Sequence, residues 1–112
     1  MNAVQTAVAA VVNLLVERAY DEVEAMTRSR WVTADDLRRV IGEYGRTLVS
    51  LPPAALESLD IVAVVDADPP AYSVVVDLWT SEEGKSDLSL ELKLVDRYGG
   101  AYEVEITDLH VL

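Results

Sequence analysis

The side chains best suited to chemistry are acidic groups and the single histidine, His110. The acids that accompany it are Asp77, Glu82, Glu83, Asp87 and Asp108. Carboxylates beside an imidazole could bind a divalent cation, and His110 with Asp108 could act as a general acid–base pair. Oxygen donors do not recur as in a calcium-binding loop, however, and no nucleophile has a recognised spacing from His110. We therefore expect no catalytic residue, no metal site and no cofactor.

Several of these acids belong to a polar loop at residues 79–87, whose residue types suit a structural task. Gly84 can adopt a positive φ, and Thr80 can close the base of the loop. Ser86 and Asp87 can accept backbone N–H groups. The sequence therefore predicts a loop that its own side chains hold in place.

Alternating strands must position these residues. After the loop, one face of the chain carries four leucines and the other carries polar side chains, which is typical of a half-buried strand. The leucines are Leu88, Leu90, Leu92 and Leu94. Residues 71–80 and 102–107 alternate in the same way, and residues 61–65 are an apolar, β-branched run. Because short connections make neighbouring strands antiparallel, we expect a four-stranded meander with a hairpin turn at residues 96–100.

The alternation breaks in the last of these strands. Ile106 is expected to face the core, so a regular strand would also turn Asp108 inward. A β-bulge between these two residues would instead bury Leu109 and Val111. It would turn Asp108 and His110 outward, together with the other polar side chains.

The N-terminal half has helical periodicity. Valines at helical spacing predict a helix over residues 3–18, and a second short helix is expected over residues 22–27, with Asp21 as its N-cap. A third helix follows Thr33, and its apolar stripe reaches Leu48. Gly45 either ends this helix or allows close packing.

Two prolines, Pro52 and Pro53, prevent any helix from continuing through them, and one short turn is expected after them. The predicted fold is α+β, with two to three N-terminal helices packed on one face of a four-stranded antiparallel β-meander. A length of 112 residues and 51% hydrophobic residues suit one domain, with a helical half at residues 1–58 and a sheet half at residues 59–112.

Composition excludes several classes of function. The absence of cysteine removes disulfides, thiolate catalysis and thiolate zinc sites. No signal peptide is visible, and no apolar run approaches the roughly 18 residues of a membrane span, so we expect a cytoplasmic protein.

The net charge of −11 is unevenly distributed along the chain. Residues 51–112 contain thirteen acidic and three basic side chains, a net charge of −10, whereas residues 1–50 are nearly balanced. Such a field repels nucleic acid and anionic membranes and attracts a basic protein. The predicted partner-binding residues are Asp77, Trp79, Glu82, Glu83, Lys85, Asp87, Asp108 and His110.

The segments D-L-W-T-S-E-E-G-K-S-D-L-S-L-E-L at residues 77–92 and D-L-H-V-L at residues 108–112 carry a resemblance. With E-Y-G at residues 43–45 and L-P-P at residues 51–53, they resemble a family of small, mostly bacterial domains of unknown function. The order of helices and strands is also similar to the cystatin-like and NTF2-like layout. That resemblance implies a ligand pocket or enzyme site between helices and sheet, and dimerisation through the sheet.

Three functions follow from these observations. The leading hypothesis is a non-enzymatic protein-binding module, whose partner could be a basic toxin, as for an immunity protein. The second is a small-molecule or enzymatic pocket, which four tyrosines would line: Tyr20, Tyr44, Tyr72 and Tyr102. The third is a homodimer that uses an apolar island of Val75, Trp79 and Val95 on the polar face of the sheet.

Overall fold

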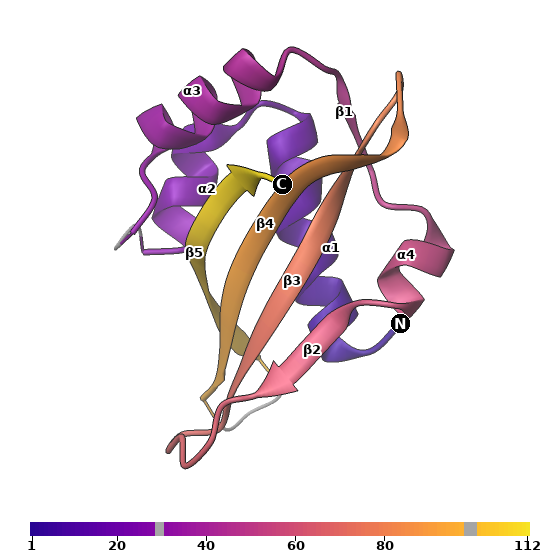
Figure 1. Ribbon diagram of the computed structural model, residues 1–112. Coiled ribbons are helices and arrows are strands. Elements are labelled where there is room, and N and C mark those ends of the chain that lie inside the picture. Colours follow the sequence, from indigo (N-terminus) through magenta and orange to yellow (C-terminus); the bar gives the residue numbers. More distant parts are fainter. Residues whose placement is uncertain (29–30, 98–100) are drawn as a thin grey trace.

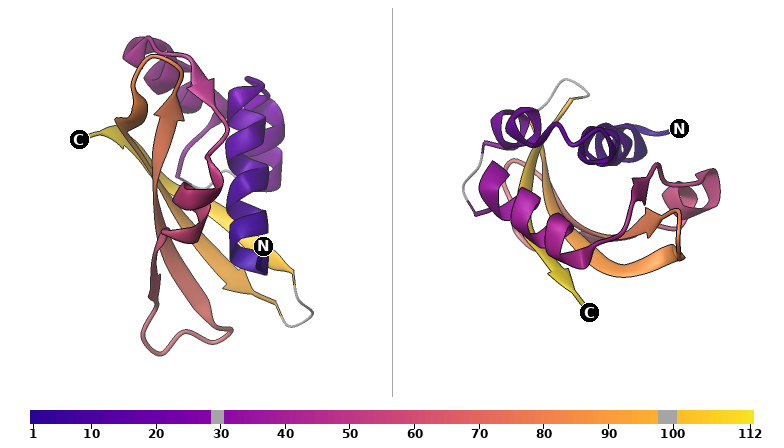
Figure 2. Two further views of the ribbon diagram at one scale, coloured as in Figure 1. Left: turned by 90° about the vertical axis from the view of Figure 1, so that its right-hand side faces the viewer. Right: turned by 90° about the horizontal axis from the view of Figure 1, so that it is seen from above.

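Helices cover one face of an antiparallel sheet in the computed structural model, which describes residues 1–28, 31–97 and 101–112 (Figure 1). The elements in chain order are α1 (Ala3–Val16), α2 (Tyr20–Met26), α3 (Ala34–Tyr44), β1 (Leu48–Val49), α4 (Pro53–Glu57), β2 (Asp60–Ala63), β3 (Ala71–Thr80), β4 (Gly84–Asp96) and β5 (Tyr102–Val111). Figure 2 shows the two layers from the side and the curvature of the sheet from above. The α+β class is confirmed.

The first two helices are separated by a tight turn, as expected, but its details differ. α1 ends at Val16, and Arg18 follows in the left-handed conformation with φ 60°. The Ala19 N–H then donates to the Leu14 carbonyl over 2.9 Å, which closes a Schellman motif. Because α2 already begins at Tyr20, Asp21 lies in its first turn, and the prediction that Asp21 is the N-cap was wrong.

The third helix begins as predicted and ends earlier. The Thr33 hydroxyl accepts from the Asp36 N–H, and the Asp36 carboxylate accepts from the Thr33 N–H, so a capping box is present. Gly45 ends α3 with a left-handed φ of 72°. The chain then leaves the helix, and Leu48 pairs with Thr80 in β1, so the prediction that Leu48 belongs to the helix was wrong.

The described strands form one five-stranded sheet in the order β1-β3-β4-β5, with β2 also paired to β3. The predicted meander is therefore confirmed as β2 to β5, and β1 is an additional strand. β1 and β2 occupy opposite ends of the same edge of β3, because Leu48 lies opposite Thr80 and Ala63 lies opposite Tyr72. The hairpin turn predicted at residues 96–100 extends outside the described residues.

The sheet buries one face against the helices. The four alternating leucines of β4 are at most 1% exposed, and burial of one such side chain contributes about 1.5–3 kcal/mol. Val76, Leu90 and Leu109 form one buried cross-strand row of this face. The prediction that Val111 is buried beside Leu109 was wrong, because Val111 is 52% exposed at the end of β5.

Two irregularities interrupt the strand pairing. Glu91 lies opposite Asp108, but Leu92 lies opposite Ile106, so Thr107 is one extra residue in β5 and the predicted bulge is confirmed. A second irregularity separates the pair Asp77–Ser89 from the pair Trp79–Lys85 and places extra residues in β4. Only the single extra residue of β5 changes which side chains face solvent, because the irregularity in β4 adds an even number of residues and keeps Lys85 and Asp87 outward.

Candidate functional site

The bulge in β5 brings two acidic side chains and the histidine together on the outer face of the sheet, the face without helices. Glu91 of β4 lies opposite Asp108, and Ser89 lies opposite His110. Cross-strand neighbours project from the same face of a sheet. Asp77 extends the row of Ser89 and His110 onto β3. Of the predicted site residues, Asp108 and His110 are therefore neighbours beside Glu91, while Asp77 lies on the same face two strands away from His110.

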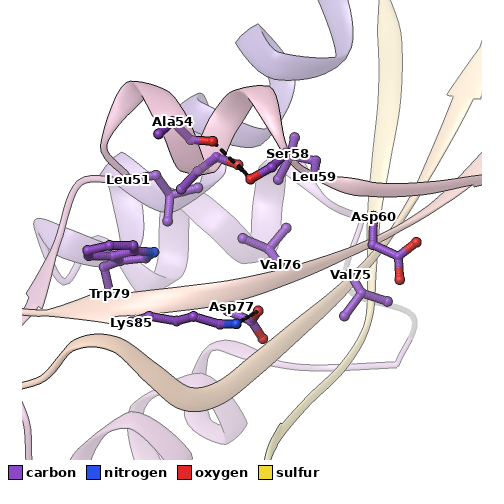
Figure 3. Close-up of a pocket in the computed structure, with 11 residues that line it drawn as sticks. Leu51, Ala54, Ser58, Leu59, Asp60, Val75, Val76, Asp77, Trp79 and Lys85 are labelled. Carbon is purple, nitrogen blue, oxygen red and sulfur yellow. Dashed lines mark hydrogen bonds and ion pairs between the residues drawn. The ribbon is translucent and has the colours of Figure 1, made fainter.

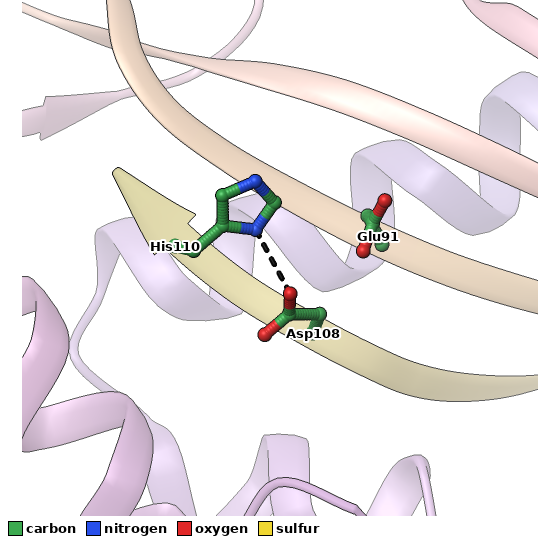
Figure 4. A group of neighbouring side chains, drawn as sticks. All are labelled: Glu91, Asp108 and His110. Atoms are coloured by element: carbon green, nitrogen blue, oxygen red, sulfur yellow. Dashed lines mark ion pairs between the residues drawn. The ribbon is translucent and has the colours of Figure 1, made fainter. Parts of the chain in front are cut away.

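The side chains of Glu91, Asp108 and His110 are close enough to share one ligand. His110 Nδ1 lies 2.9 Å from Asp108 Oδ2, and one potential ligand atom from each of Glu91, Asp108 and His110 lies within 4.8 Å of the others (Figure 4). The nitrogen is shielded from solvent, and its contact with Asp108 lacks the direction of a hydrogen bond. One imidazole nitrogen and two carboxylates are suitable ligands for a divalent cation. The same groups form an ion pair whenever His110 is protonated.

Glu91 was missed because sequence spacing does not connect it with the C-terminus. It is seventeen residues before Asp108, and only the register of β4 with β5 makes them neighbours. The bulge expected near Thr107 did not reveal this neighbour, because a hairpin register also depends on where the turn lies.

Two other predicted site residues, Glu82 and Glu83, contact the segment that follows α3. The Glu82 carboxylate accepts from the Thr47 N–H over 2.9 Å and from the Thr47 hydroxyl over 3.0 Å. The backbone hydrogen bond from Thr47 lowers the pKa of Glu82. Glu83 accepts from the Tyr44 hydroxyl over 2.9 Å. Glu82 and Glu83 therefore connect the loop to Thr47 and to Tyr44, the last residue of α3.

The loop has the internal architecture that its residue types predicted except at Asp87, whose carboxylate accepts no described backbone N–H and whose own N–H donates to the Tyr44 hydroxyl over 3.3 Å. The Thr80 hydroxyl accepts from the Glu83 N–H over 3.0 Å, and Gly84 has a φ of 74°. The Ser86 hydroxyl donates to the Leu78 carbonyl over 2.6 Å and accepts from the Leu88 N–H over 3.1 Å. Ser86 thereby satisfies backbone groups that the irregularity in β4 removes from the ladder.

Trp79 and Asp77 line a groove where α4 passes the edge of β3. We call this cavity of about 330 Å³ the α4 groove. Its lining residues are Leu51, Ala54, Ala55, Ser58, Leu59, Asp60, Val75, Val76, Asp77, Trp79 and Lys85. Figure 3 shows Trp79 near Leu51, with Asp77 and Lys85 on the neighbouring stretch of the strands. Asp77 and Lys85 form an exposed ion pair of 3.5 Å.

The groove has a simple origin in the chain. Pro52 and Pro53 end β-pairing after β1 and start α4, because proline lacks an N–H and suits a first helical turn. α4 therefore crosses the part of the β3 edge that lies between β1 and β2. Trp79 is half-buried there, while Val95, the third member of the predicted apolar island, is only 8% exposed. The exposed part of that island is thus reduced to the surroundings of Trp79 and Val75.

The four tyrosines do not gather around one cavity. Tyr72 and Tyr102 pack edge to face, with their ring centroids 6.1 Å apart. Burial raises the pKa of Tyr102. Tyr44 binds Glu83, as described above, and Tyr20 lies under the Arg38 guanidinium at 5.5 Å from the ring centroid. Each tyrosine thus has a packing or hydrogen-bonding role.

Comparison with known proteins identifies the family of the chain. In the described part of the chain, no helix is long and apolar enough to cross a membrane. No curated protein and no solved structure shows a significant match to the sequence. The model of a family described as a domain of unknown function (DUF7668) matches residues 12–112, which confirms the resemblance seen in the sequence motifs. The chain therefore belongs to the DUF7668 family of domains of unknown function.

Proposed function

We propose that the protein is a non-enzymatic binding module that captures a basic segment of a partner protein. The contact surface consists of the α4 groove and the adjoining acidic part of the outer sheet face, where Asp77, Glu91 and Asp108 lie in two neighbouring cross-strand rows. A basic toxin, the partner class of immunity proteins, would suit this surface. The acids Glu82 and Glu83 contribute through the position they impose on the loop.

The observation that carries the proposal is the composition of the α4 groove. Trp79 offers an aromatic face, Leu51 and Leu59 offer apolar contacts, and Asp60 and Asp77 supply negative charge in the same cavity. A lysine or arginine side chain has the complementary form, since it combines an apolar stem with a cationic head. A cation near an indole face gains further electrostatic attraction.

The charge of the sheet half supports a basic partner in particular. Residues 51–112 carry a net charge of −10, and fields of this kind accelerate the association of oppositely charged proteins. Lys85 partly neutralises Asp77, but their ion pair is exposed. Exposed pairs contribute only about 0–1 kcal/mol, so an incoming cation can replace Lys85.

The test uses Trp79 as its own reporter. Trp31 is 65% exposed, and replacing it in a Trp31→Phe background leaves Trp79 as the single tryptophan of the chain. Titration with a decapeptide that alternates lysine and leucine should shift the Trp79 emission and saturate. Raising NaCl from about 0.05 M to about 0.5 M should weaken this binding at least tenfold, because the Debye length shortens.

Paired variants distinguish the groove from general attraction to an acidic protein. Asp77→Lys should weaken binding of the peptide at least tenfold, whereas Asp21→Lys, on α2 in the other layer, should change the affinity less than twofold. Equal losses in both variants would show that net charge alone attracts the peptide. Binding of a glutamate–leucine decapeptide with similar affinity would also contradict the proposal.

A further inference from the structure

A second cavity, on the helical side of the molecule, has the opposite charge. It has a volume of about 670 Å³ and lies between the C-terminal ends of α1 and α3, the start of α2, and β1. Arg18, Arg38 and Arg46 line it, and none of its lining residues is acidic. Three cations around one opening are unexpected in a chain with a net charge of −11. We call this cavity the arginine pocket.

The arginine pocket also has an apolar floor. Leu15, Ile41 and Leu48 belong to its lining and are 1%, 7% and 8% exposed. Tyr20 adds an aromatic ring, over which the Arg38 guanidinium is placed. A cavity of this size can hold a small molecule, and more of its accessible lining is polar than apolar.

Two of the three arginines are available for a ligand. Arg38 lies 2.7 Å from Asp35, which neutralises part of its charge. Within residues 1–28, 31–97 and 101–112, Arg18 and Arg46 form no ion pair, and both are exposed. A guanidinium binds phosphate or carboxylate oxygens through two parallel N–H donors.

The backbone at Arg18 is a separate indication of function. Arg18 occupies the C′ position of the Schellman motif with φ 60°, a conformation in which glycine is strongly favoured. An arginine there is strained in comparison with glycine. Residues in such sparsely populated conformations are concentrated at functional sites.

The two helix ends do not cancel the positive charge. The C-termini of α1 and α3 each contribute about half a negative charge at this cavity. Together they offset about one of the three cations, and Asp35 offsets about one more. The Glu82 carboxylate, which accepts from Thr47 at the rim of the cavity, reduces the remaining charge further, so a ligand anion would depend on direct contact with Arg18 and Arg46 and not on a general positive field.

We propose that the arginine pocket binds a small organic phosphate, with its anionic group at Arg18 and Arg46 and its apolar body over Leu15 and Ile41. The site is separate from the α4 groove, and the inference stands independently of the proposed function. The phosphate would be recognised by charge-assisted hydrogen bonds, and the apolar body by burial.

The test is a titration of the isotopically labelled protein with phenyl phosphate, followed by amide NMR signals. The signals of Gly42, Gly45 and Thr47, which line the pocket, should move together and saturate in the millimolar range or below. Phenol, which lacks the anion, and inorganic phosphate, which lacks the apolar body, should each bind at least tenfold more weakly. Absence of saturation with phenyl phosphate would overturn the site, and equal binding of inorganic phosphate would overturn the organic part of the ligand.

Matched variants identify the arginines responsible. Arg18→Gly removes the charge and relieves the left-handed strain, so the fold should be retained while affinity for phenyl phosphate falls about tenfold. Arg46→Gln should cause a similar loss. Arg39→Gln is the control, since Arg39 lies on α3 beside Asp36 and Glu43 and does not line the pocket. Unchanged affinity in the first two variants, or an equal loss in the third, would overturn the assignment.

Discussion

The two glutamates Glu82 and Glu91 have different roles in this molecule, and the groups that each one contacts determine its role. Glu82 accepts two hydrogen bonds from Thr47, thirty-five residues earlier in the chain. Glu91 makes no described ion pair and faces outward beside Asp108. Nothing in the local sequence distinguishes these two glutamates, because the distinction arises from segments that meet only in the folded chain.

The bonding of Glu82 predicts a pH-dependent contribution to stability. Its pKa is lower in the folded state than the ordinary value of 4.5, because the Thr47 N–H stabilises the carboxylate. A lowered pKa stabilises the fold above the unfolded-state value, and this contribution is lost as the pH falls through the folded-state value. Glu82→Gln should therefore be less stable than the original protein at pH 7, and the difference should shrink below about pH 4.5.

Thermal unfolding of both proteins between pH 3 and pH 7 measures this difference. Glu57→Gln is the matched control, since Glu57 is exposed on α4 and no described hydrogen bond or ion pair involves its side chain. The difference in thermal stability between this control and the original protein should vary little between pH 3 and pH 7. A Glu82→Gln difference that stays constant from pH 7 to pH 3 would show that the Thr47 contact does not depend on charge.

At the scale of elements, residues with strong local signals were predicted correctly. The four leucines of β4 defined its buried face, and the Thr33–Asp36 capping box defined the start of α3. The two-residue strand β1 was missed because two residues cannot show a period. Leu48 also continued the helical stripe in sequence, although the left-handed Gly45 ends α3 three residues before it.

The bulge in β5 is the element on which the outer-face cluster depends. Deleting Thr107 should remove the bulge and leave a regular strand, with Asp108 still outward and Leu109 still inward, because Thr107 is the unpaired extra residue. Since both side chains keep their faces, the deletion should remove only the hydrogen bond of the Thr107 hydroxyl and cost at most about 1 kcal/mol. Urea unfolding measures this loss as a lower midpoint.

A substitution at the same position provides the control. Thr107→Ala keeps the extra residue and removes only the hydrogen bond from its hydroxyl to the Glu91 carbonyl, 3.2 Å long. That exposed bond should contribute at most about 1 kcal/mol. Equal, small losses in the deletion and the substitution are expected, whereas a much larger loss in the deletion would show that the bulge itself is needed to keep Leu109 in the core.

At the scale of the molecule, the sheet half carries most of the negative charge, and a group of arginines lies on the helical side. The sheet half carries −10 of the net −11, while the arginine pocket gathers cations on the helical side. The negative charge of the sheet half was visible from composition. The arginine pocket was not, because Arg18, Arg38 and Arg46 are spread over three segments that only the packing of α1, α2 and α3 brings together.

The concentration of acids in the sheet half predicts that salt stabilises the protein. Raising NaCl from about 0.01 M to about 0.5 M shortens the Debye length several-fold and screens repulsion between exposed carboxylates. Glu91→Lys, which places a cation opposite Asp108, should stabilise the fold by about 0.2–1 kcal/mol at low salt and lose this advantage at high salt. Glu43→Lys, which removes the 3.9 Å contact with Arg39 in the nearly neutral half, should give no such gain. A melting temperature that falls as NaCl increases would mean that the carboxylates of the outer face attract bound cations or basic groups more than they repel one another.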